Sequence, residues 1–219
     1  MFNVRVISHS KPAIGVELRD DLLQMVAYCA RVSNPNNQNN EETAEKLVKY
    51  LIKHQHWSPL EMASVCMEID TTRDIARQIL RHRSFSFQEF SQRYADPTKD
   101  LNFVVREARM QDDKNRQNSV AIPMEDSIHH IWESYQEIII ERCKHAYEWA
   151  INAGIAKEQA RAILPEGLTM SRMYVNGTLR SWIHYIQLRA DKGTQKEHQE
   201  IARACAEAIY QIFPLDDVI

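Results

Sequence analysis

The longest regular pattern in this sequence is a run of apolar residues at helical spacing from about Met124 to Asn152. Apolar residues three and four positions apart lie on one side of a helix, so the pattern predicts the longest helix of the chain, with one side in the core. Gly154 follows and is expected to end this helix. A helix of this length favours folds in which helices supply much of the packing surface. The residues predicted to reach the core are Ile128, Ile131, Trp132, Tyr135, Ile138, Ile139, Cys143 and Ala146.

Shorter patterns predict the other elements. Alternating apolar and polar residues indicate strands at 1–8, 63–71 and 102–110. Because these strands are few and the helices are long, we expect a single α+β domain over residues 1–219, with a small, mainly antiparallel sheet packed with long helices. Asn40 is expected to cap the helix that follows it. Helical spacing predicts further helices at 20–32, 41–54, 72–83, 157–164, 179–190 and 195–212.

Composition excludes several classes of protein. The five glycines form neither a Gly-x-Gly-x-x-Gly fingerprint nor a P-loop, so neither motif holds a nucleotide. No apolar run is long enough to cross a bilayer, and the N-terminus lacks the layout of a signal peptide. The four cysteines lie far apart in the sequence, which argues against a disulfide framework. We therefore expect a cytoplasmic protein, or one in the host cytoplasm if the source is viral, with no membrane partner.

The segment from Arg81 to Tyr94 concentrates positive charge in a chain whose formal net charge is −3. It holds three arginines, one histidine, one carboxylate and four aromatic residues in fourteen positions. Guanidinium groups bind phosphate bidentately and stack on flat rings, so the segment predicts a site for a phosphorylated, planar ligand. A solvated basic surface is the alternative. Single-stranded nucleic acid, stacked on Phe85, Phe87 and Tyr94, is another, which the acidic pI of 6.3 disfavours. Phe85 and Phe87 alternate, so at least one of them is expected to pack inward.

Polar side chains around this segment suit such a ligand. Gln78 and Arg81 are three positions apart and are expected to share a helix face. Ser91 and Arg93 offer hydroxyl, backbone N–H and guanidinium donors to a phosphate. Glu89 could accept a hydrogen bond from a ribose or a ring N–H, or it could pair with an arginine.

A second group of arginines comes much later in the chain, at Arg161, Arg180 and Arg189. Arg180 and His184 are four positions apart and share a helix face. Arg189 lies about half a turn around the same helix, so one helix could serve two ligands on opposite faces. Arg73, in contrast, is expected to be a solvated side chain.

Histidines offer only weak candidates for a metal site. The candidates are His54 with His56, and His129 with His130 and Glu133. Neither set has His-Glu-x-x-His spacing or a convincing third ligand, so we expect no metal.

The basic segment also resembles a known signature. Arg-His-Arg, then seven residues, then Ser, with Glu two positions before that Ser and Arg two after it, is similar to the signature of the flavin-dependent thymidylate synthases. The resemblance extends from the turn at 58–61 to the helix start at 195–197, and it includes the arginines of Ala-Arg-Ala-Ile-Leu-Pro and Leu-Arg-Ala. The matched signature positions are Arg81, His82, Arg83, Glu89, Ser91 and Arg93.

The resemblance implies a role for each matched residue. It implies that Arg189 is catalytic, because it polarises the uracil ring and stabilises negative charge that develops there. The dUMP-binding residues that it implies are Gln78, Arg81, Glu89, Ser91, Gln92, Arg93, Arg161 and Arg189. The FAD-binding residues that it implies are Ser64, Arg81, His82, Arg83, Glu89, Thr178, Arg180 and His184.

The resemblance further implies a reaction and an assembly. FAD would be the cofactor, NADPH the hydride source and methylenetetrahydrofolate the carbon donor for reductive methylation of dUMP to dTMP. The protein would be a homotetramer whose active sites are each assembled from several subunits. Nucleic acid is not an expected partner.

Three positions depart from the family pattern. Met62 and Gly193 stand where histidines are common, and His184 stands where an asparagine is common. The change at Met62 removes a hydrogen bond to the flavin, whereas His184 keeps a polar contact. A flavoprotein that has the fold but has lost methyl transfer is therefore an alternative hypothesis.

Overall fold

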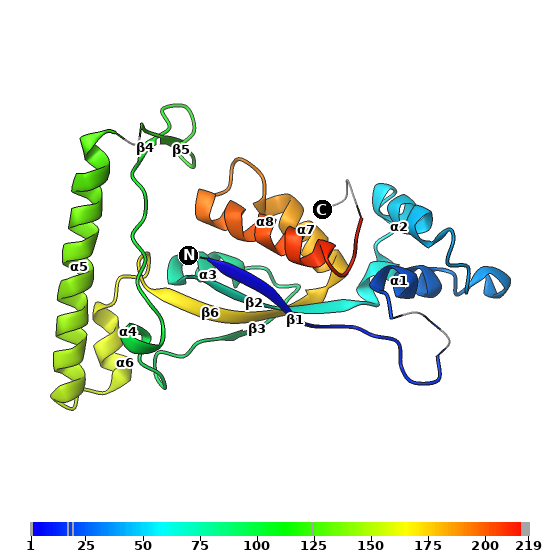
Figure 1. Cartoon of the computed structure of the whole chain (residues 1–219), viewed down its shortest axis with the longest axis horizontal. Coiled ribbons are helices and arrows are strands. Elements are labelled where there is room, and N and C mark those ends of the chain that lie inside the picture. Colours follow the sequence, from blue (N-terminus) through cyan, green and yellow to red (C-terminus); the bar gives the residue numbers. More distant parts are fainter. Residues whose placement is uncertain (1, 17, 19, 124, 216–219) are drawn as a thin grey trace.

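The structure, a computed structural model, describes residues 2–16, 18, 20–123 and 125–215. A four-stranded sheet lies at the centre of an elongated molecule (Figure 1). Every neighbouring pair of its strands is antiparallel, which confirms the predicted α+β class with a small antiparallel sheet. The order across the sheet is β1 (Asn3–His9), β2 (Ser64–Thr72), β6 (Met170–Thr178) and β3 (Ser86–Glu89).

Alternation along the strands divides the sheet into an apolar and a polar face. Val65 and Met67 of β2 are fully buried in the main core. Glu68 and Asp70 alternate with them and pair with Arg5 and Arg172 on the other face. Figure 1 shows α7 and α8 side by side along the sheet. The helices α3 (Arg73–Ile79), α7 (Leu179–Arg189) and α8 (Lys196–Tyr210) contribute to the same core, as do the two helices described next.

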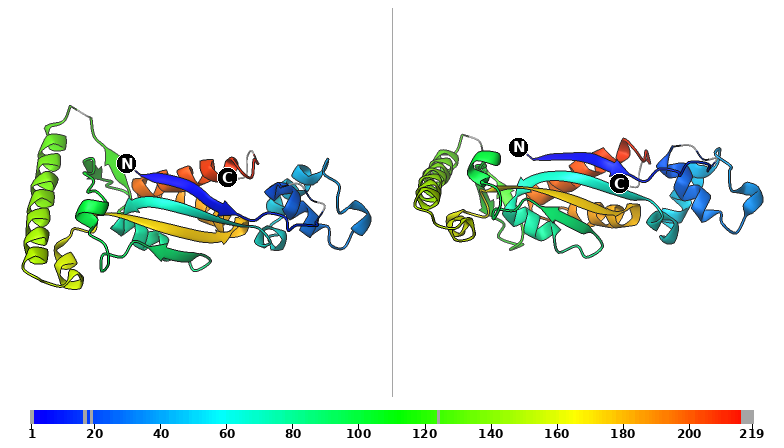
Figure 2. Two further views of the ribbon diagram at one scale, coloured as in Figure 1. Left: turned by 60° about the horizontal axis from the view of Figure 1, so that its bottom comes forward. Right: turned by 90° about the horizontal axis from the view of Figure 1, so that it is seen from below.

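Two helices lie at one end of the molecule, α1 (Leu22–Ala30) and α2 (Ala44–Lys53) (Figure 2). The predicted capping of α2 by Asn40 is wrong, because the helix begins four residues later. The Asn40 carbonyl and the Thr43 hydroxyl instead accept hydrogen bonds from the guanidinium of Arg31. The neighbouring 3-10 turns are η1 (Pro35–Asn37) and η2 (Ser58–Glu61).

Helix α3 is shorter than predicted, because it ends at Ile79 rather than at residue 83. The backbone then forms tight turns, in which the Arg81 N–H donates to Gln78 O and the His82 N–H donates to Ile79 O. Arg81 therefore lies beyond the helix, and the prediction that it shares a helix face with Gln78 is wrong. Arg81, His82 and Arg83 are presented by a turn between α3 and β3.

Strand β6 was not predicted, although it is central in the sheet. Its buried residues Met173 and Val175 alternate with Tyr174 and Asn176, which point to the other face. Gly177 lies so close to Phe85 that a Cβ atom there would be 2.3 Å from the ring. Phe85 is buried, which confirms that at least one of the two alternating phenylalanines packs inward and leaves its ring unavailable for base stacking. β3, which carries Phe87, was also not predicted.

Most of the strand predicted at 102–110 is irregular backbone. Only Arg109–Gln111 forms a strand, β4, paired with β5 (Ser119–Ala121) in a hairpin. Before it, Gln136 accepts from the Arg106 backbone N–H and donates to the Arg106 carbonyl, both at 2.9 Å. A side chain of the long helix thus replaces the neighbouring strand that the alternation had suggested.

The long helix α5 (Ser127–Asn152) stands at the other end of the molecule, and Gly154 follows it with a φ of +83°. The start near Met124 falls outside the described residues; Asp126 caps the helix by accepting from Ile128 N. Its predicted burial is wrong: Ile131 is 55% exposed and Tyr135 is 61% exposed. Trp132, Ile128, Ile138 and Ile139 are exposed as well, while Cys143 and Ala146 are half-buried.

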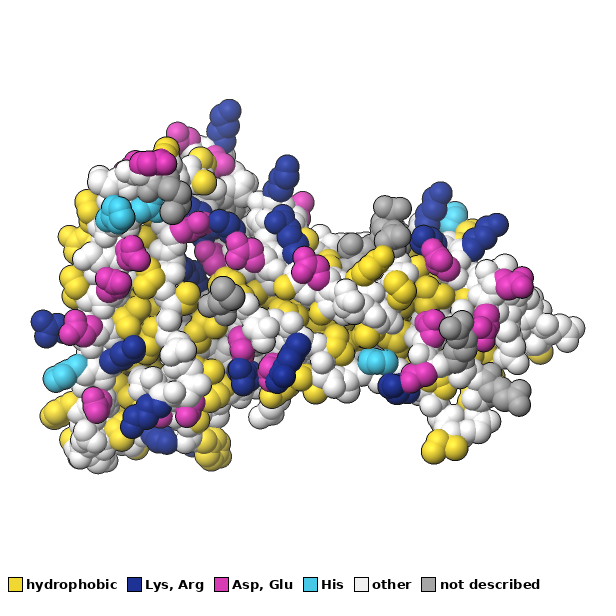
Figure 3. All heavy atoms as spheres, viewed as in Figure 1, with side chains coloured by type: hydrophobic (Ala, Val, Ile, Leu, Met, Phe, Trp, Pro, Cys, Tyr) yellow, Lys and Arg dark blue, Asp and Glu magenta, His cyan; other side chains and the backbone are white. Residues whose placement is uncertain are grey.

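The apolar stripe of α5 is exposed and does not pack in the main core, and Figure 3 shows hydrophobic side chains on this end of the surface. Tyr147 and Ala150, in the last turns of α5, are buried and form a small second cluster with Ala160 and Leu164. The short elements nearby are α4 (Pro97–Asp100), α6 (Lys157–Ala160) and η3 (Arg161–Ile163). None of the helices within the described residues is long and apolar enough to cross a membrane.

Candidate functional site

Two hydroxyl residues expected at the flavin meet at one end of the sheet. Ser64 and Thr178 are direct partners in the β2–β6 register. Thr178 caps α7, because its hydroxyl accepts from the Ser181 N–H at 3.3 Å. The Ser181 hydroxyl in turn donates to the Ser84 carbonyl at 3.3 Å. The start of α7 is thereby linked to the turn that carries Arg81, His82 and Arg83.

Arg180 and His184, in the first turns of α7, both contact the η2 turn, as expected for residues that share a helix face. Arg180 pairs with Glu61 of η2. The His184 ring packs edge-on against Trp57, with 4.4 Å between ring centroids. Burial and the nearby Arg180 lower the pKa of His184 below its ordinary value, so this ring is neutral at pH 7.

Arg189, at the far end of α7, contacts a different part of the molecule. Its Nε donates to Nε2 of His82 at 3.0 Å. Burial, Arg189 and Arg81 lower the pKa of His82 to about 4, so the imidazole is neutral at pH 7. Because a guanidinium can only donate, Nε2 must accept and the ring proton lies on Nδ1. His82 therefore fixes the Arg189 side chain without adding charge.

Behind His82, a ring contact leads to a separate chain of hydrogen bonds. Its ring lies edge-on to Tyr185, with 5.0 Å between centroids, and the Tyr185 hydroxyl is 3.1 Å from Nε2 of His198. Nδ1 of His198 is 3.2 Å from Oε1 of Gln78, whose Nε2 donates to Gln195 Oε1 at 2.9 Å. Together we call Gln78, His82, Tyr185, Arg189, Gln195 and His198 the histidine cluster.

His198 is fully buried, and burial is the main cause that lowers its pKa to about 3. Since Gln78 Oε1 is an acceptor, the Nδ1–H of the neutral ring donates to it, and Nε2 accepts from Tyr185. Sequence reasoning missed His198. A signal existed, because His198 shares a stripe at helical spacing with the buried residues Ile201, Ala202 and Cys205.

A separate cavity of about 380 Å³ is lined by Arg73, Arg77 and Arg161. Arg73 is 7% exposed, so the prediction that it is solvated is wrong. Glu89 and Glu166 lie 3.6 and 3.7 Å from its guanidinium and offset the cost of burying it. We call this space the arginine cavity; it is lined by Arg73, Arg77, Gln92, Glu158, Arg161, Ala162, Leu164 and Glu166.

Gln92 is 4% exposed, and its Nε2 has no hydrogen-bond partner among the described residues. A buried amide donor without a partner is costly, so its place on the wall of the arginine cavity indicates a ligand that accepts from it. Arg93 extends to the same cavity, because its guanidinium is 3.5 Å from Glu158. The Ser91 hydroxyl accepts from the Arg93 N–H at 3.4 Å.

Glu89 makes the second of the two interactions considered for it. It lies between Arg73, at 3.6 Å, and Arg77, at 3.7 Å. The Ser171 hydroxyl also donates to it, at 2.9 Å. In this chain Glu89 holds arginines of α3 in place.

The structure does not bring all the predicted residues together. The lining of the arginine cavity includes none of Gln78, Arg81 and Arg189. Arg81 and Arg83 are exposed, and neither forms an ion pair with any described residue. One chain therefore presents two separate polar sites, and the exposed arginines of the turn are available to a ligand or to a neighbouring chain.

In the part of the chain that the structure describes, no group of three or more histidine, cysteine or acidic side chains could hold a metal ion. His54 and His56 instead contact the ring of Tyr50, with centroids 4.2 and 6.1 Å away. Met62, one of the departures from the family pattern, is 56% exposed.

Comparison with known proteins identifies close relatives over almost the whole chain. Residues 16–215 match the family described as "Thymidylate synthase complementing protein". The "Probable flavin-dependent thymidylate synthase" of Paramecium bursaria Chlorella virus 1 is 47% identical over 214 residues, which cover 97% of this chain and 95% of the viral protein. The "Flavin-dependent thymidylate synthase" of Synechocystis sp. is 48% identical over 215 residues, 97% of this chain and 96% of that protein.

A solved structure has the same fold. The UMP/dUMP methylase PolB from Streptomyces cacaoi, bound with 5-Br dUMP, superposes with a TM-score of 0.80. The match covers 98% of this chain and 92% of that chain, at 24% sequence identity. At this identity the likeness establishes the architecture, and the two relatives above establish the kinship.

Proposed function

This chain belongs to the family of flavin-dependent thymidylate synthases, and from that premise we propose how its residues carry out the conversion of dUMP to dTMP. FAD, when bound, supplies the hydride chemistry, and the protein supplies binding, orientation and charge. NADPH is the expected hydride source and methylenetetrahydrofolate the expected carbon donor. Residues 1–219 act as one domain in this proposal. The free cysteines of the described chain support a cytoplasmic location.

Residues at the end of the sheet are suited to FAD. Ser64 and Thr178 offer hydroxyls, and Arg180 lies in the first turn of an eleven-residue helix, where backbone N–H groups favour a diphosphate. The ion pair of Arg180 with Glu61 is on the surface, with both side chains 41% exposed. Such pairs contribute only about 0–1 kcal/mol, so a diphosphate can replace Glu61 as the partner. We assign FAD binding to Ser64, Arg81, His82, Arg83, Glu89, Thr178, Arg180 and His184.

The histidine cluster is suited to the pyrimidine ring of dUMP. His198 and Gln195 each use one hydrogen-bonding group of the Gln78 amide, which leaves one N–H and one lone pair for a uracil edge. His82 fixes Arg189, which makes no ion pair with a described residue and so remains free for the ring. A guanidinium at the uracil edge stabilises negative charge as it develops, which is the catalytic role that we assign to Arg189.

The arginine cavity is suited to the phosphate of dUMP. It offers the Arg161 guanidinium and the unpartnered Gln92 amide, with Ser91 and Arg93 beside it. Arginine with hydroxyl and amide donors is a common phosphate-binding combination. The full set that we assign to dUMP is Gln78, Arg81, Glu89, Ser91, Gln92, Arg93, Arg161 and Arg189.

A site divided in this way is completed by several chains. We infer a homotetramer in which the histidine cluster of one subunit faces the arginine cavity of another. The exposed apolar stripe of α5 supports this, because Ile131, Tyr135 and Ile138 would otherwise face water. Symmetric association would cover these side chains and complete the site in one step.

The observation that carries the proposal is the neutral His82 that holds Arg189 beside the arginines of the turn. As a test, purified protein with FAD should be yellow and should release tritium from C5 of labelled dUMP when NADPH and methylenetetrahydrofolate are present. The Arg189→Ala variant should keep the colour and lose the release. A protein that cannot be reconstituted with FAD would disprove the proposal.

A flavoprotein without methyl transfer is the second candidate, favoured by the exposed Met62 and by Gly193. Formation of dTMP by the wild-type protein separates the two. A protein that binds FAD and oxidises NADPH but yields no dTMP would support the second candidate.

A further inference from the structure

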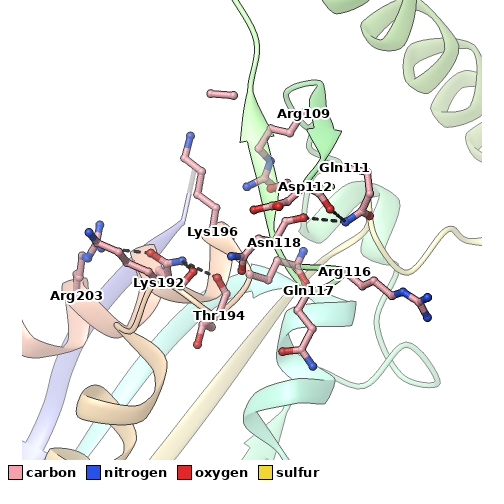
Figure 4. A pocket seen from close by; sticks show the side chains of 14 residues that line it. Arg109, Gln111, Asp112, Arg116, Gln117, Asn118, Lys192, Thr194, Lys196 and Arg203 are labelled. Carbon is pink, nitrogen blue, oxygen red and sulfur yellow. Dashed lines mark hydrogen bonds between the residues drawn. The ribbon is translucent and has the colours of Figure 1, made fainter. Parts of the chain in front are cut away.

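A polar pocket lies next to the histidine cluster and apart from the arginine cavity. It has a volume of about 630 Å³ and is formed by the β4–β5 hairpin, the turn between α7 and α8, and the first turns of α8 (Figure 4). Side chains of all three segments line it, and we call it the hairpin pocket. Its positively charged residues are Arg109, Arg116, Lys192, Lys196 and Arg203.

Among the described residues, Asp112 supplies the only carboxylate that lines this pocket. It accepts from the backbone N–H groups of Lys114, at 2.8 Å, and Asn115, at 3.0 Å, so it is held by its own hairpin. These hydrogen bonds lower the pKa of Asp112 and keep it ionised without using the cations opposite.

Three of the five cations have no acidic partner among the described residues. Lys196 pairs with Glu107, and Arg109 pairs with Glu197. Arg203 donates only to the neutral amide of Gln199, at 3.2 Å. The others without a partner are Lys192 and Arg116, and Figure 4 shows that Arg116 extends away from the rest.

Lys192 and Arg203 have no acidic partner among the described residues, and Lys196 adds a third cation that is shared with Glu107, so positive charge is concentrated here on an acidic protein. Like charges repel unless an anion lies between them, so the cluster indicates an anionic ligand. Arg109 adds a further donor, because its Nη1 is buried without a hydrogen-bond partner in the described chain.

The pocket adjoins the histidine cluster. Gln195 lines the pocket and also accepts the hydrogen bond from Gln78 Nε2 at 2.9 Å. Lys192 follows the last residue of α7, Arg189, by three positions. A ligand with its reactive end at Arg189 and Gln78 could therefore extend into the pocket along Gln195.

We propose that the hairpin pocket binds the anionic end of a co-substrate of the proposed reaction, through Lys192, Lys196 and Arg203. The inference rests on the proposed function for the identity of the ligand, and on the pocket itself for its charge. Two co-substrates have such an end: phosphates in NADPH, and glutamate carboxylates in the folate. Phosphate and carboxylate are recognised by the same donors, so the experiment has an arm for each.

The test uses the full chain with Lys192→Gln and Arg203→Gln together. The matched control is Lys46→Gln with Lys53→Gln, which removes two exposed lysines from α2. We expect the pocket variant to raise KM for one co-substrate by about tenfold with kcat nearly unchanged, because uniform binding is lost. The control should behave like the wild type.

The two arms of the experiment identify which co-substrate supplies the anion. If the ligand is the dinucleotide, the wild type prefers NADPH to NADH and the pocket variant loses the preference. If it is the folate, the wild type prefers a polyglutamylated folate to the monoglutamate and the variant loses that preference. Unchanged preferences in both arms would overturn the proposal.

A binding measurement keeps the proposal separate from the proposed function. In the presence of excess FAD and dUMP, which occupy the other phosphate sites, inorganic diphosphate should bind the wild type and the control in a calorimeter. It should bind the pocket variant at least tenfold less tightly, and added salt should weaken the binding. If the pocket variant binds diphosphate with the same affinity as the wild type, the pocket is not an anion site, whatever the turnover assay gives. If diphosphate distinguishes the proteins but no dTMP forms, the pocket proposal holds and the proposed function fails.

Discussion

Gly177 should be intolerant of even one added methyl group, because of its contact with Phe85. A Cβ at this position would lie 2.3 Å from Cδ1 and 2.5 Å from Cε1 of that ring. Carbon atoms in ordinary contact are about 3.5–4.0 Å apart, so the ring would have to move by more than about 1 Å. It has little room, because Phe85 is 8% exposed and packs on Trp182 with 4.6 Å between centroids. Trp182 is itself held by a hydrogen bond to the Val65 carbonyl.

Overpacking of this kind costs about 1–3 kcal/mol. For a chain of this size the Gly177→Ala change should lower Tm by roughly 2–12 °C, measured at a fixed protein concentration because association also stabilises. The movement should also affect the site, because the Phe85 ring lies 6.4 Å from that of His82. We therefore expect kcat to fall at a temperature where the variant is still folded.

A double-mutant cycle isolates the clash from other effects of alanine. With Phe85→Ala in place, the methyl group enters the space that the ring has left, and alanine suits a strand better than glycine does. The Gly177→Ala change should then be neutral or stabilising, which gives a coupling of at least about 1 kcal/mol. Two results would refute the reasoning: a Gly177→Ala change that lowers stability equally with and without Phe85→Ala, or one that raises stability while Phe85 is present.

Three further predictions follow from the site and the surface. The free energy of unfolding should decrease as pH falls from about 6.5 toward 4, because His82 and His198 have pKa values of about 4 and about 3 in the folded protein, so the unfolded chain takes up protons first. Urea unfolding at several pH values measures this decrease, and the His82→Gln change should make it smaller. The His198→Leu change should lower the free energy of unfolding by about 1–3 kcal/mol and raise KM for dUMP, because it leaves Gln78 Oε1 and the Tyr185 hydroxyl without their partner. A wild-type KM would show that the position of Gln78 does not depend on His198. Ile131→Asp on α5 should shift the protein to smaller species in size-exclusion chromatography, whereas an unchanged elution volume would show that the stripe is not an interface.

Periodicity in the sequence predicted the helices well, because α5, α7 and α8 each repeat apolar residues over several turns. It predicted the burial of α5 wrongly, because the pattern shows which side is apolar but not what covers it. Strand β6 was missed because Arg172, Asn176 and Gly177 interrupt its apolar residues. Those residues face the polar side of the sheet or accommodate Phe85, which only the tertiary structure reveals.

The sequence predicted a set of site residues but not their geometry. The spaced signature identified the turn with Arg81, His82 and Arg83, and the later arginines, but not that His82 fixes Arg189. His198 was missed because the stripe that it shares with Ile201 and Cys205 indicates a buried side of the helix but not what the imidazole ring contacts. Arg73 was predicted to be solvated because the two carboxylates that pair with it come from distant segments.

In the proposed mechanism the active site is shared between subunits, with Arg189 from one chain and Arg161 from another. Complementation tests this directly: the Arg189→Ala and Arg161→Ala variants are purified separately, dissociated, mixed and reassembled, and dTMP formation is measured. We predict that each variant alone is inactive and that the mixture regains on the order of a quarter of wild-type turnover, the share of sites that combine two intact halves by chance. No recovery, in a mixture shown by native mass spectrometry to contain hybrid tetramers, would place both arginines in one subunit and contradict the account.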